Sequence, residues 1–154
     1  MANTYTKIYL HIIFAVKNRN ALLPAIYLPK IHAYIGGIIR KLGHVPVSIG
    51  GTENHVHCLI LYNPNQPIPD MVRDLKSASS AHINQERYIP FRFEWQRGYG
   101  CFSISHSHVD SVTNYIRNQF EHHKNISLED EIQKILTKYN VEYDPKYIIK
   151  EPDE

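Results

Sequence analysis

The sequence predicts an α+β fold, an antiparallel sheet with helices of the ferredoxin-like or RNA-recognition-motif-like kind. Along the chain, segments in which every second residue is apolar, as in strands, are followed by segments with the 3.6-residue period of helices. Their order along the chain is strand, helix, strand, strand, helix, strand, helix, helix. Because strand–helix–strand occurs twice, we expect helices on one face of the sheet and an open second face for a substrate or partner.

The first strand is predicted over residues 6–16. From Ile8 to Val16 every second side chain is apolar, which predicts one buried face and places His11 on the other face. A connection that contains proline follows. Apolar residues at helical spacing from Ile31 to Leu42 then predict a helix, with Gly43 at its end.

The remaining elements follow from the same periods. Residues 45–49 and 55–62 predict a hairpin whose loop is Gly50 to Asn54. A helix over about 69–85 and a strand over 99–105 come next. Ser107 and Asp110 have capping-box spacing and predict a helix that runs to about Lys124. A last helix over 128–139 leads into a polar tail at 141–154.

Composition limits the class of protein. The chain has 154 residues, which fits a single domain over 1–154. With 43% hydrophobic and 21% charged residues it has no signature of disorder, and a net charge of +2 gives no large basic field. Cys58 and Cys101 lie in strand-like runs and are expected to be reduced core thiols. No signal-peptide core or apolar run long enough for a bilayer occurs, so we expect a cytoplasmic protein without a membrane partner.

The first candidate for chemistry is His55-Val56-His57. Residues two apart in a strand point the same way, so both imidazoles can bind one divalent metal while Val56 enters the core. The pattern is weak by itself, because a chain with ten histidines produces it readily by chance. It recurs at His106 and His108, at a strand-to-helix junction where chance is the better explanation.

The second candidate is the helix that begins near Val109. Its apolar stripe is formed by Val109, Val112, Ile116 and Phe120. Tyr115 and Gln119 are four residues apart and lie together at the border of this stripe. They are therefore free to face a metal, although a tyrosine at such a border is often only an amphipathic filler.

These residues carry a resemblance to a known family. His55-Val56-His57 resembles the His-hydrophobic-His motif of HUH endonucleases. The run from Tyr115 to Gln119, with Glu121-His122-His123 after it, resembles the nucleophile helix of single-tyrosine transposases. The segment Trp95 to Gly100 is similar to the one that precedes this helix in the same family. The chain thus resembles the TnpA-like transposases of short insertion sequences that move as single-stranded DNA.

The resemblance implies a function and a site. It implies the HUH fold, Tyr115 as nucleophile, and His55, His57 and Gln119 as ligands of Mg²⁺ or Mn²⁺. Attack would join the 5′ phosphate of the DNA to Tyr115 and free a 3′ hydroxyl. The implied partners are single-stranded DNA, with hairpins at the element ends, and a second copy of the chain in a homodimer.

Two further expectations concern the metal and the DNA. The implied ligand set contains no carboxylate, so the phosphate of the DNA must supply negative charge, and manganese accepts imidazole more readily than magnesium does. Basic residues near the predicted second helix and fourth strand could contact the DNA backbone. These candidate DNA contacts are Lys17, Arg73, Lys76, Arg92 and Arg97.

Two other functions were weighed. A histidine-triad nucleotide hydrolase requires a third histidine two residues after His57, and that position is Leu59. This alternative is therefore excluded. A non-catalytic protein that binds single-stranded nucleic acid and derives from a transposase remains open, because intact site residues do not measure activity.

Overall fold

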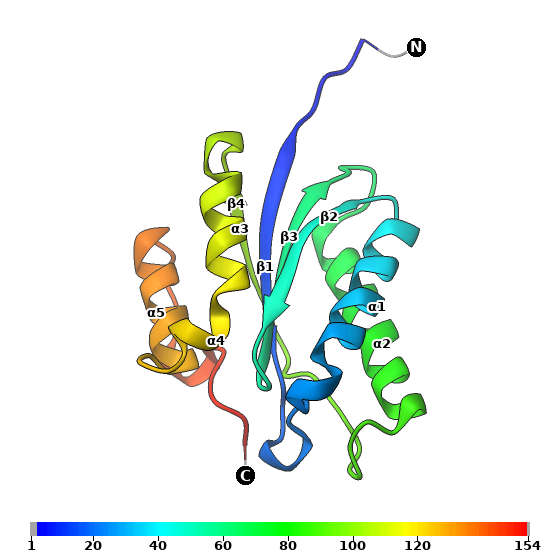
Figure 1. Ribbon diagram of the computed structural model, residues 1–154. Helices are drawn as coiled ribbons and strands as arrows, with labels where there is room; N and C mark the ends of the chain where they lie inside the picture. The colour runs from blue at the N-terminus through cyan, green and yellow to red at the C-terminus, as the bar shows by residue number, and fades with distance from the viewer. Residues whose placement is uncertain (1–2, 154) are drawn as a thin grey trace.

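The predicted antiparallel sheet is present, with the strand order β2-β3-β1-β4 (Figure 1). A computed structural model describes residues 3–153. The central strands β1 (Ile8–Ala15) and β3 (His55–Tyr62) pair with each other. The edge strands are β2 (Val45–Gly51), beside β3, and β4 (Gly100–Ile104), beside β1. The predicted α+β class is confirmed.

One face of the sheet, which we call the first face, is covered by two helices. These are α1 (Leu28–Lys41) and α2 (Ile68–Glu86). The apolar side chains of these two helices form the largest core cluster together with Leu10, Ile12 and Phe14, which alternate along β1. The predicted helices therefore begin and end within a few residues of the observed ones. No helix of the described chain is both long and apolar enough to cross a membrane.

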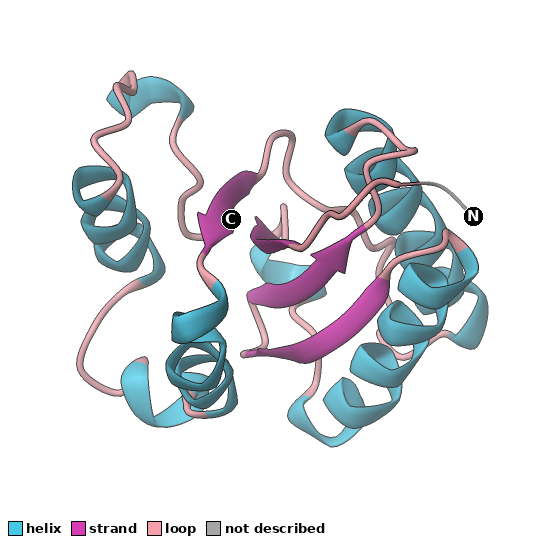
Figure 2. Ribbon diagram, turned by 90° about the horizontal axis from the view of Figure 1, so that it is seen from above, coloured by secondary structure: helices cyan, strands magenta, loops and turns pink. Residues whose placement is uncertain are grey.

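The second face is not open, so that expectation was wrong. Helices α3 (Val109–Arg117), α4 (Gln119–His122) and α5 (Leu128–Lys138) lie over it, opposite α1 and α2 (Figure 2). Ile13 and Ala15 pack against Leu128 and Ile132 of α5. The strand pattern contained the signal, because apolar Ile13 interrupts the alternation on the face that was expected to be exposed.

The predicted helix to Lys124 is broken between α3 and α4. Asn118 has φ −97° and ψ 22°, outside the helical region, and it separates Tyr115 from Gln119. The break also turns Phe120 out of the expected apolar stripe, since 49% of its surface is exposed. The predicted capping box is absent as well: α3 begins at Val109, and the Ser107 hydroxyl contacts His108 instead of capping the helix.

The segment after α5 is more than a polar tail. Ile149 is buried in the cluster on the second face. The Glu151 carboxylate accepts hydrogen bonds from the backbone N–H of Leu128, at 2.7 Å, and from Asn54 Nδ2, at 3.1 Å. This segment therefore ties the start of α5 to the loop before β3.

The two cysteines are free thiols, as expected. Cys58 is buried and Cys101 is partly buried. Burial raises the pKa of Cys58 to about 12 and that of Cys101 to about 11, so both stay protonated and unreactive at neutral pH.

Candidate metal centre

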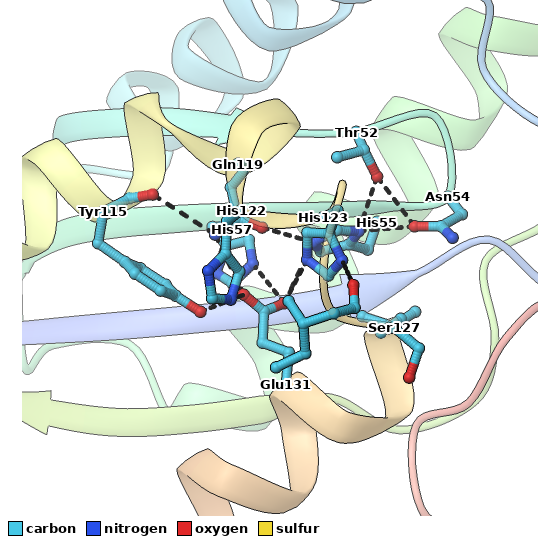
Figure 3. A network of polar contacts seen from close by, with 12 residues as sticks. Thr52, Asn54, His55, His57, Tyr115, Gln119, His122, His123, Ser127 and Glu131 are labelled. Atoms are coloured by element: carbon cyan, nitrogen blue, oxygen red, sulfur yellow. Dashed lines mark hydrogen bonds and ion pairs between the residues drawn. The ribbon is translucent and has the colours of Figure 1, made fainter.

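His55 and His57 lie at the start of β3 and are completely buried. Val56 between them belongs to the core of the first face. Both imidazoles therefore project from the second face, as the two-residue period of a strand requires (Figure 3).

Hydrogen bonds hold the outer nitrogen of each imidazole. His55 Nδ1 lies 2.7 Å from Asn54 Oδ1, and His57 Nδ1 lies 2.7 Å from His11 Nε2. Such contacts set the tautomer and orientation of metal-binding histidines. His11 was expected on an exposed face, yet it is buried beneath α3–α5, and only the fold reveals its contact with His57. Burial lowers the pKa of His11 to about 3 and of His57 to about 4, so both rings are neutral.

Tyr115 and Gln119 reach the same place from α3 and α4. Gln119 is buried, and its Oε1 lies 2.8 Å from His55 Nε2. The Tyr115 ring meets the His57 ring edge-on, with 5.7 Å between centroids. The structure thus brings together, within one chain, the four residues singled out from the sequence (Figure 3).

A fifth group, Glu131 of α5, was not found from the sequence. Its carboxylate is buried at the centre of the cluster (Figure 3). Oε1 lies 3.2 Å from His57 Nε2 and 3.3 Å from His55 Nε2. Oε2 accepts hydrogen bonds from Gln119 Nε2, at 3.1 Å, and from the Tyr115 hydroxyl. A signal existed, because an acidic residue occupies the apolar stripe of α5 between Leu128 and Ile132.

The charges in this cluster are strongly perturbed. Burial opposes ionisation of Glu131, but hydrogen bonds from His123, His55 and His57 outweigh it and hold its pKa far below the usual range. The pKa of Tyr115 is raised well above its ordinary value. Burial is the largest cause, and the nearby charge of Glu131 is the second. In this state Tyr115 is therefore a neutral phenol that donates to an ionised carboxylate.

The donor set fits a divalent cation. Oxygen acceptors lie on both sides of His55: Asn54 Oδ1 beside Nδ1, and the Oε1 atoms of Gln119 and Glu131 beside Nε2. Both nitrogens of the His55 ring therefore face oxygen atoms. A cation could be held by His55 Nε2, His57 Nε2 and Gln119 Oε1, because imidazole with oxygen ligands suits first-row divalent ions.

A cavity of about 310 Å³ leads to Tyr115. It is lined by Tyr115 and Glu131, and by Lys134 and Lys138 of α5. The cavity provides an approach to the tyrosine hydroxyl, with two cations placed along it.

The second His-x-His pair does not take part. His106 and His108 are both exposed. Within residues 3–153, the side chains that could hold a metal form two groups around Glu131, one with His55 and His57 and one with His122 and His123. The geometry supports chance as the origin of the pair at 106–108.

The candidate DNA contacts lie elsewhere, in an open groove of about 720 Å³ along α2. It is lined by Lys17, Arg73, Lys76, Arg92 and Arg97, together with the segment that contains Trp95. Some of this charge is offset: Glu94 pairs with Lys17 at 3.1 Å and with Arg92 at 3.4 Å. Lys76 donates to the backbone carbonyls of Gln96 and Gly98, and burial lowers its pKa to about 8.

Comparisons with known proteins agree with this arrangement. The family model described as "Transposase IS200 like" matches residues 4–119. The ISDra2 transposase TnpA of Deinococcus radiodurans is 25% identical over 116 residues, which cover 72% of this chain and 83% of that protein.

Two solved structures share the fold. A candidate transposase from Deinococcus radiodurans R1 is 25% identical, with a TM-score of 0.57, over 77% of this chain and 95% of that one. A REP-associated tyrosine transposase bound to a REP hairpin has a TM-score of 0.59, at 15% identity, over 82% of this chain and 74% of that one.

Proposed function

The chain belongs to the IS200-like family of single-tyrosine transposases, and on that premise we propose that it nicks and rejoins single-stranded DNA at insertion-sequence ends. One observation carries the proposal. The Tyr115 hydroxyl, the Nε2 atoms of His55 and His57, and Gln119 Nε2 all contact the buried carboxylate of Glu131, which lines a cavity. A nucleophile beside a metal-binding donor set is what phosphodiester cleavage requires.

The proposed reaction uses both Tyr115 and Glu131. Glu131 Oε2 accepts a hydrogen bond from the Tyr115 hydroxyl and so orients its oxygen, which attacks the phosphorus as it loses its proton. A bond between that oxygen and phosphorus forms while the bond from phosphorus to the 3′ oxygen breaks, and the leaving 3′ oxygen ends with the proton that the tyrosine lost. The product is a 5′-phosphotyrosine with a free 3′ hydroxyl, whose attack in the reverse direction rejoins DNA without a nucleotide cofactor.

A divalent metal, Mg²⁺ or Mn²⁺, completes this proposal. His55, His57 and Gln119 would hold it. Bound there, the metal would draw charge from the scissile phosphate and hold it for in-line attack. Lys134 and Lys138 along the cavity favour an incoming phosphate.

The test is covalent capture of DNA. Wild type, incubated with single-stranded DNA that carries the element ends and with Mg²⁺ or Mn²⁺, should give a protein–DNA adduct that survives denaturation. Tyr115→Phe should form none while still binding the DNA, because only the nucleophilic oxygen is lost. Tyr147→Phe, at a tyrosine that is 86% exposed, should form the adduct like wild type. Wild type that binds DNA without forming an adduct would favour the alternative, a non-catalytic single-stranded-DNA-binding protein.

For the partner, we propose single-stranded DNA with a hairpin, bound partly by the basic groove along α2. The hairpin-bound relative and the five cations of the groove support this. Arg97→Ala should weaken binding and make the slope of log affinity against log salt less negative by about 0.7, the value for one phosphate contact on a single strand. Arg40→Ala, at an exposed position of α1 outside the groove, should leave the slope unchanged. An unchanged slope in Arg97→Ala would remove Arg97 from the interface.

We also propose that the protein acts as a homodimer. The described chain places one tyrosine at its site, and two tyrosines are needed to cut and exchange both ends of an element. Two copies of the chain would supply them.

A further inference from the structure

His55 needs a bare Nε2 to bind a metal, yet oxygen atoms lie against both nitrogens of its ring. On the metal side, Gln119 Oε1 lies 2.8 Å and Glu131 Oε1 lies 3.3 Å from Nε2. On the outer side, Asn54 Oδ1 lies 2.7 Å from Nδ1. An imidazole with one N–H can carry that proton on either nitrogen, and a proton on Nε2 would block the ligand position. The hydrogen bonds on the outer side therefore bear directly on metal binding.

The C-terminal segment fixes the orientation of the Asn54 amide. A carboxylate only accepts hydrogen bonds, so the amide turns its NH2 group to Glu151, with 3.1 Å between Nδ2 and Oε2. The amide oxygen is then left to face His55. Because this oxygen is an acceptor, it favours the proton on Nδ1 and a bare Nε2.

Thr52 supports the same position of the proton. Its hydroxyl donates to Asn54 Oδ1, at 3.0 Å, and also lies 3.0 Å from His55 Nδ1 (Figure 3). A hydroxyl has a single proton, so a hydroxyl that donates to Asn54 can only accept from His55. Two oxygen acceptors on the outer side thus favour a protonated Nδ1.

The other oxygen of Glu151 lies at the start of α5. Oε1 accepts from the backbone N–H of Leu128, the first residue of that helix, at 2.7 Å. Glu131 follows three residues later, within the first turn. One carboxylate therefore contacts both the loop before β3 and the helix that carries Glu131.

We propose that Glu151 is a positioning residue of the metal centre, which acts through Asn54 to keep the proton of His55 on Nδ1 and to leave Nε2 bare for the metal. The inference rests on the proposed function only for the presence of a divalent metal. Partners on the outer nitrogen of metal-bound histidines set the tautomer and the ring orientation in this way. The sequence pattern does not reveal the link, because Glu151 is 97 residues from Asn54.

The test locates the proton of His55 in the metal-free full chain by nuclear magnetic resonance of the ring nitrogens. Glu151→Gln keeps the shape of the side chain but puts an NH2 group in place of one oxygen. If the remaining oxygen keeps the N–H of Leu128, the new NH2 group faces Asn54, whose amide must turn over and present its own NH2 group to Nδ1. The fraction of His55 with a proton on Nδ1 should therefore fall. Glu142→Gln, at an exposed position of the same C-terminal segment, should leave that fraction unchanged.

Exchanging the two partners provides a second variant. In Asn54→Asp combined with Glu151→Gln, the NH2 group at position 151 donates to the carboxylate at position 54, which in turn accepts from His55 Nδ1. The proton should return to Nδ1, as in wild type. A role of Glu151 in stability alone would not produce this rescue, because it does not depend on which partner carries the amide.

Metal affinity should follow the position of the proton. In Glu151→Gln, Mn²⁺ should bind about tenfold or more weakly, measured from the electron paramagnetic resonance signal of the free ion, since loss of an outer partner commonly costs about 10–100-fold. The double variant should recover most of this loss. An unchanged proton position in Glu151→Gln would overturn the proposal even if Mn²⁺ bound more weakly, because the lost charge would then explain the affinity. Wild-type Mn²⁺ affinity in a variant whose proton has moved would overturn it as well.

These outcomes are separate from those of the proposed function, because the proton of His55 is located without DNA. Covalent DNA capture by a protein in which this proton ignores Glu151 would uphold the transposase and reject the positioning role. A wild type that never captures DNA, although its His55 proton and Mn²⁺ affinity follow Glu151, would uphold the positioning role and reject the transposase.

Discussion

Replacing His57 with alanine should slow formation of the DNA adduct by about 1000-fold. Polarisation of a phosphate by a metal is worth several kcal/mol, and each 1.36 kcal/mol is a factor of ten in rate. His57 Nε2 faces the centre of the cluster, and its side chain is completely buried. The measurement is the initial rate of adduct formation at saturating Mn²⁺.

His108→Ala is the matched control, because it removes an exposed imidazole outside the cluster. It should react at the wild-type rate. An adduct formed by His57→Ala as fast as by wild type would show that His57 does not hold the metal.

Mixing two inactive variants tests which chain supplies the nucleophile. Tyr115 lies at the histidines of its own chain, so a dimer of His57→Ala with Tyr115→Phe should contain no complete site. We therefore expect the mixture to remain inactive. Recovery of adduct formation would mean that the tyrosine helix completes the partner's site.

Replacing Gly50 with valine should damage both the fold and the site. A β-carbon at Gly50 would lie 2.6 Å from the carbonyl oxygen of Ile116 and 2.9 Å from its Cγ2. The glycine therefore allows α3 to lie directly on β2. The contact is at Ile116, the residue that follows Tyr115 in α3. Valine must push α3 away, at a cost of about 1–3 kcal/mol or more in the free energy of unfolding. Tyr115 moves with the helix, so the adduct rate should also fall.

Thermal unfolding and the adduct assay check this together. Gly37→Ala is the control, since a β-carbon there meets no atom within 4 Å. Because Gly37 is an exposed position in the middle of α1, alanine should stabilise the protein by about 0.5–1 kcal/mol. Wild-type stability in Gly50→Val would contradict the close packing of α3 on β2.

Local pattern predicted most of the secondary structure, and tertiary packing decided the exceptions. Strand and helix periods located β1 to β4 and the helices α1, α2 and α5 to within a few residues, because each has a continuous apolar face. The break at Asn118 was missed, because the apolar stripe predicted from Val109 to Phe120 runs past it without a gap. The packing of α3, α4 and α5 over the second face was missed too, because strand alternation does not show what lies above the sheet.

The histidine pair, the tyrosine and the glutamine could be identified from the sequence by itself. His55 and His57 share a face because a strand has a period of two, and Tyr115 and Gln119 stand apart from the apolar stripe of the helix predicted from Val109 to Lys124. Only the tertiary structure brought in His11, His123 and Glu131. Glu131 is 74 residues from His57, and no local period relates two side chains at that separation. The sheet and α5 must first pack together before a carboxylate meets the imidazoles, so the charge at the centre of the site is a property of the fold.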